Sequence, residues 1–168
     1  MKVIEAELKG VVIIFLEAYE DNRGYFVDSY KQQELAKYGI PPFVQQSQSF
    51  SRQNVIRGLH FQKLPYSQAK LVRVLKGKIL DVIVDLRKDS PSYGKHLAIE
   101  LSETDFKQIF IPEGFAHGFS VLSEDALVSY NLDRYYNPLY EGGIRYDDPE
   151  LAIDWKVKHP VVSEKDRK

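Results

Sequence analysis

Short stretches of alternating or continuous apolar residues, separated by turn-forming residues, run along most of this chain. The clearest alternation lies between Ile79 and Leu86, where every second residue from Leu80 onward is aliphatic and falls on one face of an extended strand. Similar patterns predict strands over 11–16, 25–30, 71–75, 79–86, 96–101, 108–111, 118–122 and 126–132, and the polar segment 43–50 is also extended in character.

The segments between these strands predict turns and little helix. Lys76-Gly77-Lys78 predicts a tight turn that would join 71–75 and 79–86 into a hairpin. One short helix is expected over 32–38, ended by Gly39. Residues 102–105 resemble a capping box that could start a single helical turn. Nine short strands with one or two short peripheral helices favour an all-β sandwich or jelly roll over an α/β fold.

Composition narrows the classes of protein that this chain can represent. Its 168 residues are enough to bury one core, so we expect a single domain over 1–168. The absence of cysteine excludes disulfides, thiol catalysis and thiolate metal sites. A net charge of −1 provides no general attraction to nucleic acid or anionic membranes. Because no apolar run is long enough to cross a bilayer and no signal peptide is evident, we expect a cytoplasmic protein without membrane or nucleic-acid partners.

A dense set of polar side chains lies in the middle of the chain, at Arg57, His60, Gln62 and Lys70. Period-2 spacing places His60 and Gln62 on one face of an extended segment and apolar neighbours on the other. Taken alone, a histidine is more often packed or solvated than catalytic. This context therefore marks His60 as a candidate for chemistry.

A second histidine, His117, closes the pattern Pro-x-Gly-x-x-His over 112–117. This pattern resembles the second motif of the cupin superfamily, whose members are jelly-roll barrels. The first cupin motif usually supplies two histidines two residues apart for a metal, and here that pair is His60 and Gln62. We therefore expect a cupin barrel with no metal and no cofactor, and a metal-dependent cupin remains the alternative.

Seven segments in order carry a closer resemblance, and they lie at 21–26, 54–62, 68–73, 85–91, 111–119, 141–145 and 162–166. With them the chain resembles the dTDP-4-dehydrorhamnose 3,5-epimerases, metal-free cupin enzymes, from about Val11 to Asp166. The resemblance implies epimerisation at C3 and C5 of dTDP-4-dehydro-6-deoxy-D-glucose to dTDP-4-dehydro-L-rhamnose, in dTDP-L-rhamnose biosynthesis. A C3-only epimerase, another 4-keto sugar-nucleotide epimerase and a non-catalytic binding module remain alternatives.

The implied chemistry needs a base on one face of the sugar, an acid on the other and a group that holds the enolate oxygen. The resemblance makes His60 the base, with Asp166 stabilising the imidazolium that forms. Lys70 would stabilise the enolate, and Tyr130 would return the proton from the opposite face. Tyr130 shares its face of the strand with aliphatic residues, so simple core packing is the alternative interpretation for it.

The resemblance also implies a set of substrate contacts. Arg57 and Arg23 are placed to meet the diphosphate, for which bidentate guanidinium contacts are well suited. The remaining implied contacts are Asp28, Gln45, Ser47, His117, Tyr136, Glu141 and Lys165. Surface salt bridges are the alternative for Arg23, Glu141 and Lys165.

The chain departs from the usual family pattern at Gln46 and Ser47, where Asp and Asn are common, and at Asp28, where Glu is common. These departures leave base recognition and the exact sugar nucleotide open. In this family two subunits exchange an N-terminal strand, so the resemblance implies a homodimer in which Arg23 and Asp28 serve the neighbouring site. The expected partners are thus a dTDP-sugar substrate and a second copy of the chain.

Overall fold

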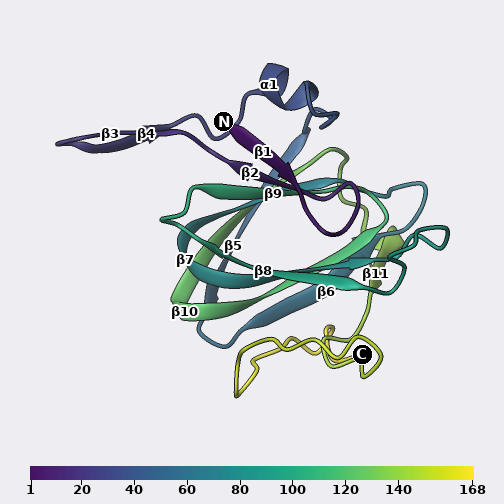
Figure 1. The fold of residues 1–168 in the computed structure, drawn as a ribbon. Helices are drawn as coiled ribbons and strands as arrows, with labels where there is room; N and C mark the ends of the chain where they lie inside the picture. Colours follow the sequence, from purple (N-terminus) through teal and green to yellow (C-terminus); the bar gives the residue numbers. More distant parts are fainter.

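The computed structural model describes residues 1–168, which form a β-barrel with a protruding hairpin at one end of the chain and a long irregular tail at the other (Figure 1). Two short helices are present, α1 (Gln32–Ala36) and η1 (Pro138–Tyr140). The strands are β1 (Lys2–Glu5), β2 (Val12–Phe15), β3 (Ala18–Asp21), β4 (Gly24–Val27), β5 (Gln45–Arg52), β6 (Ile56–Gln62), β7 (Lys70–Asp85), β8 (His96–Ser102), β9 (Lys107–Ile111), β10 (Phe115–Leu132) and β11 (Glu141–Gly143).

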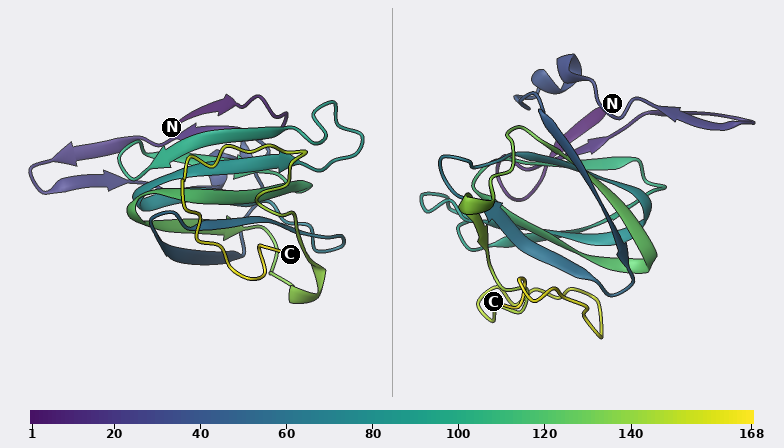
Figure 2. Two further views of the ribbon diagram at one scale, coloured as in Figure 1. Left: turned by 90° about the horizontal axis from the view of Figure 1, so that it is seen from below. Right: turned by 180° about the vertical axis from the view of Figure 1, so that it is seen from behind.

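Two long antiparallel strands, β7 and β10, organise the barrel. The first part of β7 pairs with β9 and its later part pairs with β8, while β10 pairs first with β6 and then with β5. The two ends of each long strand therefore have different neighbours, and the single nine-stranded sheet folds around a common interior as a jelly roll. The all-β prediction is confirmed, and the two helices lie outside the barrel wall (Figures 1 and 2).

The predicted hairpin at Lys76-Gly77-Lys78 is wrong, because β7 passes straight through these residues as one strand. Gly77 has a φ of +78°, and the register of β10 shifts opposite it, so the glycine marks a bulge rather than a turn. A Cβ at Gly77 would lie 2.1 Å from the carbonyl oxygen of Asp125, which only glycine tolerates. The two strands expected at 118–122 and 126–132 are likewise parts of the single strand β10.

Helix α1 forms where the sequence predicts it and ends two residues earlier than expected. Gly39 follows it with a φ of +73°, and Leu35 is buried against the outside of the barrel. The predicted helical turn at 102–105 is wrong. Asp105 instead accepts hydrogen bonds from the backbone N–H groups of Ser102 and Lys107, which closes a loop between β8 and β9. Neither helix has the length and apolar character to span a membrane.

The aliphatic face of the later part of β7 packs against the C-terminal tail rather than into the barrel. Leu80, Val82 and Val84 are buried in one cluster with Trp155 and Val162. The indole N–H of Trp155 donates to the carbonyl oxygen of Tyr146 at 2.6 Å, which fixes the ring. The tail is thus held under the barrel by packing, as Figure 2 shows from below and behind.

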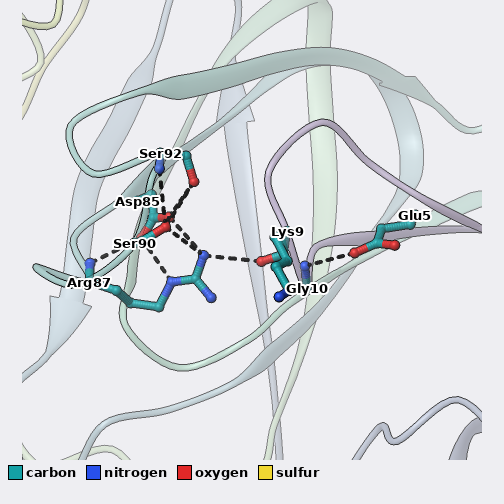
Figure 3. A network of polar contacts seen from close by, with 7 residues as sticks. All are labelled: Glu5, Lys9, Gly10, Asp85, Arg87, Ser90 and Ser92. Carbon is teal, nitrogen blue, oxygen red and sulfur yellow. Dashed lines mark hydrogen bonds and ion pairs between the residues drawn. The ribbon is translucent and has the colours of Figure 1, made fainter.

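The opposite face of β7 carries two fully buried carboxylates, Asp81 and Asp85. Asp85 accepts hydrogen bonds from the guanidinium of Arg87 and from the hydroxyls of Ser90 and Ser92, and Arg87 also donates to the carbonyl oxygen of Lys9 (Figure 3). Burial alone raises the pKa of Asp85, but these hydrogen bonds hold it well below its ordinary value. The network joins the loop after β7 to the N-terminal segment.

The hairpin formed by β3 and β4 extends away from the barrel (Figure 1). Three of its aromatic side chains are more than half exposed: Tyr19 at 58%, Tyr25 at 57% and Phe26 at 63%. Arg23 lies at the turn between the two strands, where its guanidinium is bound by Asp21. A two-stranded hairpin with so much exposed aromatic surface is not stable by itself, so packing must support it.

Candidate active site

His60 on β6 and Asp166 in the tail form a close pair across 106 residues of sequence. Nε2 of His60 lies 2.6 Å from Oδ1 of Asp166, and the side chains are 31% and 5% exposed, respectively. The second carboxylate oxygen of Asp166 accepts the backbone N–H of Gly58 at 3.3 Å. The contact between His60 and Asp166 that the family resemblance implies is therefore present. One carboxylate oxygen of Asp166 contacts the His60 ring and the other contacts the backbone of Gly58.

Lys70, the first residue of β7, reaches toward the same histidine. Its Nζ lies 3.4 Å from the carbonyl oxygen of His60. Burial lowers the pKa of the Lys70 ammonium to about 8, although the nearby carboxylates of Asp81 and Glu141 act in the opposite direction. Lys70 therefore provides a cation that is incompletely hydrated and close to His60.

A second histidine–carboxylate pair lies inside the barrel, where Nε2 of His117 is 2.7 Å from Oδ1 of Asp81. Their side chains are 4% and 0% exposed. His117 on β10 is the direct cross-strand neighbour of His60 on β6, and its ring lies 6.3 Å from that of Tyr130 in an edge-on arrangement. His117 thus connects the His60 region with the position of Tyr130.

Tyr130 lies further along β10 and points into the barrel interior, as its spacing predicts, with its ring beside Phe119. Its hydroxyl makes a 2.7 Å hydrogen bond with Oγ of Ser49 on β5. Burial raises the pKa of Tyr130 above its ordinary value, and the charge of Asp81 adds to this, while Ser49 and Arg57 oppose it. The phenol is therefore held in its protonated form.

The inward-facing side chains of β5 are short and polar, and most of them contact a candidate residue. Ser51 accepts a 2.8 Å hydrogen bond from Nε of Arg57, whose guanidinium also donates to the carbonyl oxygen of Phe50. Gln45 donates to Ser47 at 3.2 Å and accepts the backbone N–H of Tyr136 at 3.0 Å. The strand therefore positions Arg57, Tyr130 and Tyr136 from one side of the barrel.

Glu141 joins three parts of the chain at the edge of the site. Its carboxylate accepts a 2.7 Å hydrogen bond from the hydroxyl of Tyr136 and forms an ion pair with Lys165 in the tail. Burial raises the pKa of Glu141. The contacts with Lys165 and Tyr136, together with the nearby His60, outweigh this effect and lower the pKa below its ordinary value. An open pocket beside His60 is lined by Glu141, Lys165 and Asp166.

Two of the predicted site residues do not join this cluster within the chain. Arg23 is at the turn of the protruding hairpin with its side chain 86% exposed, and it pairs with Asp21. Asp28 lies just after the hairpin and forms an ion pair with Lys31. Within one chain Arg23 is therefore in a surface salt bridge, which is the alternative interpretation given for it, and Asp28 is in an ion pair as well.

The structure adds three residues that the sequence did not single out for the site, namely Asp81, Ser49 and Ser51. Asp81 lies between Ile79 and Ile83 on the inward parity of β7, which is a signal that the pattern contained. The two serines share inward parity with Gln45 and Ser47 along β5, but their partners on β10 and β6 become known only from strand pairing.

No group of three His, Cys, Asp or Glu side chains is placed to share a metal ion. Gln62, which occupies the position of a cupin metal ligand, uses its amide oxygen to accept the backbone N–H of Asn137 at 3.0 Å. It therefore holds the loop before η1. The fold and these side chains define a jelly-roll barrel with the groups of an acid–base enzyme: two histidine–carboxylate pairs, a partly buried amine and a partly buried phenol.

Comparison with known proteins identifies the family. The family model described as dTDP-4-dehydrorhamnose 3,5-epimerase matches residues 5–168. The enzyme of that name from Methanothermobacter thermautotrophicus is 45% identical over 99% of this chain and 91% of its own length. The chain therefore belongs to the dTDP-4-dehydrorhamnose 3,5-epimerase family, a family of isomerases. A dTDP-4-dehydrorhamnose 3-epimerase from Streptomyces niveus is also similar, at 37% identity over 99% of this chain and 82% of that protein.

Solved structures agree with this assignment. The epimerase from Bacillus anthracis, determined with TDP and PPi bound, has a TM-score of 0.96 and 43% identity, covering 99% of this chain and 96% of that one. The epimerase from Legionella pneumophila, determined in complex with dTDP-4-keto-L-rhamnose, has a TM-score of 0.94 and 42% identity, covering 98% and 89%. The fold of this chain is therefore that of its family.

Proposed function

We propose that this protein inverts C3 and C5 of dTDP-4-dehydro-6-deoxy-D-glucose to form dTDP-4-dehydro-L-rhamnose, in dTDP-L-rhamnose biosynthesis. Family membership over residues 5–168 supports the activity, and the observation that carries the chemistry is the 2.6 Å contact between His60 and Asp166 beside the ammonium of Lys70. A 4-keto sugar has acidic C–H bonds on both sides of its ketone, so a base and an acid suffice and no redox cofactor is needed.

In the proposed mechanism His60 removes the proton from C3 or C5. The electrons of the broken C–H bond move to the ketone oxygen, and an enolate forms. The imidazolium that results lies against the carboxylate of Asp166, whose side chain is almost fully buried. Because a charge-assisted hydrogen bond of this kind is worth more than a neutral one, the pair favours proton abstraction.

Lys70 and Tyr130 act on the enolate in different ways. The Lys70 ammonium holds the negative oxygen, and at a pKa of about 8 it is still cationic at neutral pH. Tyr130 then donates its proton to the carbon from the face opposite His60, which inverts the centre. After each inversion, solvent returns a proton to the phenolate and takes one from the imidazolium, so the same two residues can act on the second carbon.

The substrate contacts proposed from the family are Arg57 and Arg23 for the diphosphate, with Asp28, Gln45, Ser47, His117, Tyr136, Glu141 and Lys165 around the sugar and nucleoside. The position of Arg57 on β6, which pairs with the strand β10 that carries Tyr130, and its hydrogen bond to Ser51 support its part in this set. Tyr136 is 46% exposed and offers an aromatic surface for stacking.

The activity is tested by incubating the protein with dTDP-4-dehydro-6-deoxy-D-glucose in D₂O and following the sugar by NMR. Deuterium incorporation and inversion at both C3 and C5 are the expected result. Inversion at C3 alone would assign the protein to the 3-epimerases, of which the Streptomyces niveus enzyme is a relative at 37% identity. Exchange at neither carbon would reject the proposal, and dependence of turnover on a stoichiometric bound metal would favour a metal-dependent cupin.

We also propose that two copies of the chain form a homodimer in which the β3–β4 hairpin of each reaches the site of the other. The exposed aromatic residues of this hairpin support the idea, because they need a surface to cover them. On the barrel, Nε of Arg73 and Oε1 of Gln108 are buried, adjacent across β7 and β9, and without a partner in the chain. The same two side chains line an open pocket together with Tyr30, and this pocket is a surface that a second copy would cover.

Mixing two inactive variants, His60→Ala and Arg23→Ala, tests this arrangement. If the hairpins are exchanged, each mixed dimer contains one site with both native residues, so about a quarter of wild-type activity returns after random reassociation. If each hairpin serves its own barrel, no activity returns. Light scattering of the wild type gives the mass of the assembly independently.

A further inference from the structure

The Tyr130 hydroxyl makes one polar contact in the chain, and its partner is Ser49. Ser49 is not among the site residues that the family resemblance implies. The two oxygens are 2.7 Å apart, with Ser49 half-buried on β5 and Tyr130 on the neighbouring part of β10. Ser49 and Tyr130 are not directly opposite: Ser49 pairs with Val128 and Tyr130 pairs with Ser47. The hydroxyls therefore meet diagonally across two strands, and the rigidity of both strands fixes their separation.

We propose that Ser49 is a positioning residue that orients the hydroxyl of Tyr130 and stabilises its phenolate after the proton has been donated. This inference rests on the proposed function and deepens it. The role follows from the direction of the hydrogen bond. If the O–H of Tyr130 points at the sugar carbon, its oxygen accepts, so the O–H of Ser49 must be the donor.

The hydrogen bond from Ser49 stabilises the Tyr130 oxygen most strongly at the moment of proton transfer. As the enolate electrons form the new C–H bond, the O–H bond of Tyr130 breaks and a negative oxygen is left inside the barrel, on a ring that packs beside Phe119 and edge-on to His117. Burial and the Asp81 carboxylate both raise the pKa of Tyr130, which makes it a reluctant acid. A hydrogen bond from Ser49 is much stronger to the phenolate than to the phenol, so it lowers the barrier to donation.

The strand β5 shows why serine suits this position. Its inward-facing residues are Gln45, Ser47, Ser49 and Ser51; the hydroxyl of Ser51 accepts from Arg57, and that of Ser49 contacts Tyr130. Short hydroxyl side chains leave room for the sugar in the barrel and still supply a donor. Without Ser49 the hydroxyl of Tyr130 would have no hydrogen-bond partner in the chain.

Ser49→Val and Ser49→Thr form a matched pair that tests the role, because they differ only in a methyl or a hydroxyl and both suit a β-strand. The readout is the ratio of inversion to deuterium exchange, measured by NMR at C3 and C5 in D₂O. His60 still abstracts protons in both variants, so exchange should persist. We expect Ser49→Val to lower the ratio roughly tenfold or more, the size of one hydrogen bond to a charged group. Ser49→Thr should retain most of the wild-type ratio.

The outcomes separate the inference from the proposed function. Wild-type protein that exchanges deuterium at neither carbon rejects the proposed function. Normal wild-type inversion with an unchanged ratio in Ser49→Val overturns the inference alone, as does a parallel loss of exchange and inversion in both variants. Gln48→Ala, on the exposed outer face of the same strand, is the control for general disturbance of β5 and should leave the ratio unchanged.

Discussion

Asp166→Asn removes the negative charge behind His60 and keeps nearly the same shape. In the wild type the carboxylate lies 2.6 Å from Nε2 of His60 and is only 5% exposed, so little water screens the interaction. A hydrogen bond to a charged group is worth about 1.5–3 kcal/mol, and most of it is realised only when the imidazolium forms. We therefore expect kcat to fall roughly 10- to 100-fold.

The assay for this prediction follows both exchange and inversion of the dTDP-4-keto sugar in D₂O. Because proton abstraction precedes both events, the two rates should fall together, whereas Ser49→Val should lower inversion and leave exchange in place. KM should change little, since Asp166 faces His60 and the backbone of Gly58. Glu164→Gln removes an exposed carboxylate from the same tail and should leave kcat unchanged. A folded Asp166→Asn variant that loses less than about threefold in kcat would refute the reasoning.

Three further predictions concern stability and pH. Asp85→Asn should lower the free energy of unfolding by about 3 kcal/mol, since Arg87 and two serines lose a buried anion, and thermal melting should show a fall of about 6–12 °C. The pKa of Asp85 is lower in the folded state than in the unfolded state, so its contribution to the free energy of unfolding is present above the unfolded pKa of about 4 and is lost as the pH falls. The melting temperatures of wild type and variant should therefore converge in acid. A difference that stays constant with pH would contradict this. The kcat/KM of the wild type should fall as pH rises through about 8, where the Lys70 ammonium deprotonates, and an activity that is flat to pH 9.5 or so would count against its role. Trp155→Ala should cost about 3–5 kcal/mol and also reduce kcat, because the tail that carries Asp166 loses its buried anchor; circular dichroism melts and turnover assays check both effects.

Much of the fold was predictable from local patterns. Alternating residues over 79–86 and 96–101, the aromatic and β-branched stretches, and the stop signal at Gly39 indicated an all-β protein with a short helix, as the structure confirms. The error at Gly77 has a clear physical origin. A glycine between two apolar stretches permits either a hairpin turn or a bulge in one long strand, and only the partner strand β10 decides between them.

The candidate site was predictable as a set of residues but not as an arrangement. Local motifs and family resemblance pointed to His60, Lys70, Tyr130 and Asp166, and the structure places His60 against Asp166. The roles of these four residues stay predictions until the variants are measured. The partnership of Tyr130 with Ser49 had no local signal, because the two residues meet only when β5 pairs with β10.

The sequence by itself determined which segments form strands, which face of each strand is apolar and which ionisable side chains are available, since these depend on residues within a few positions of one another. The tertiary structure alone decided which of those side chains meet. Asp166 in the tail lies against His60, which is 106 residues earlier in the sequence. The two meet because Trp155 and Val162 are buried against the outer face of β7 and bring the tail across β6. Such long-range contacts depend on the packing of the whole barrel, which no local pattern encodes.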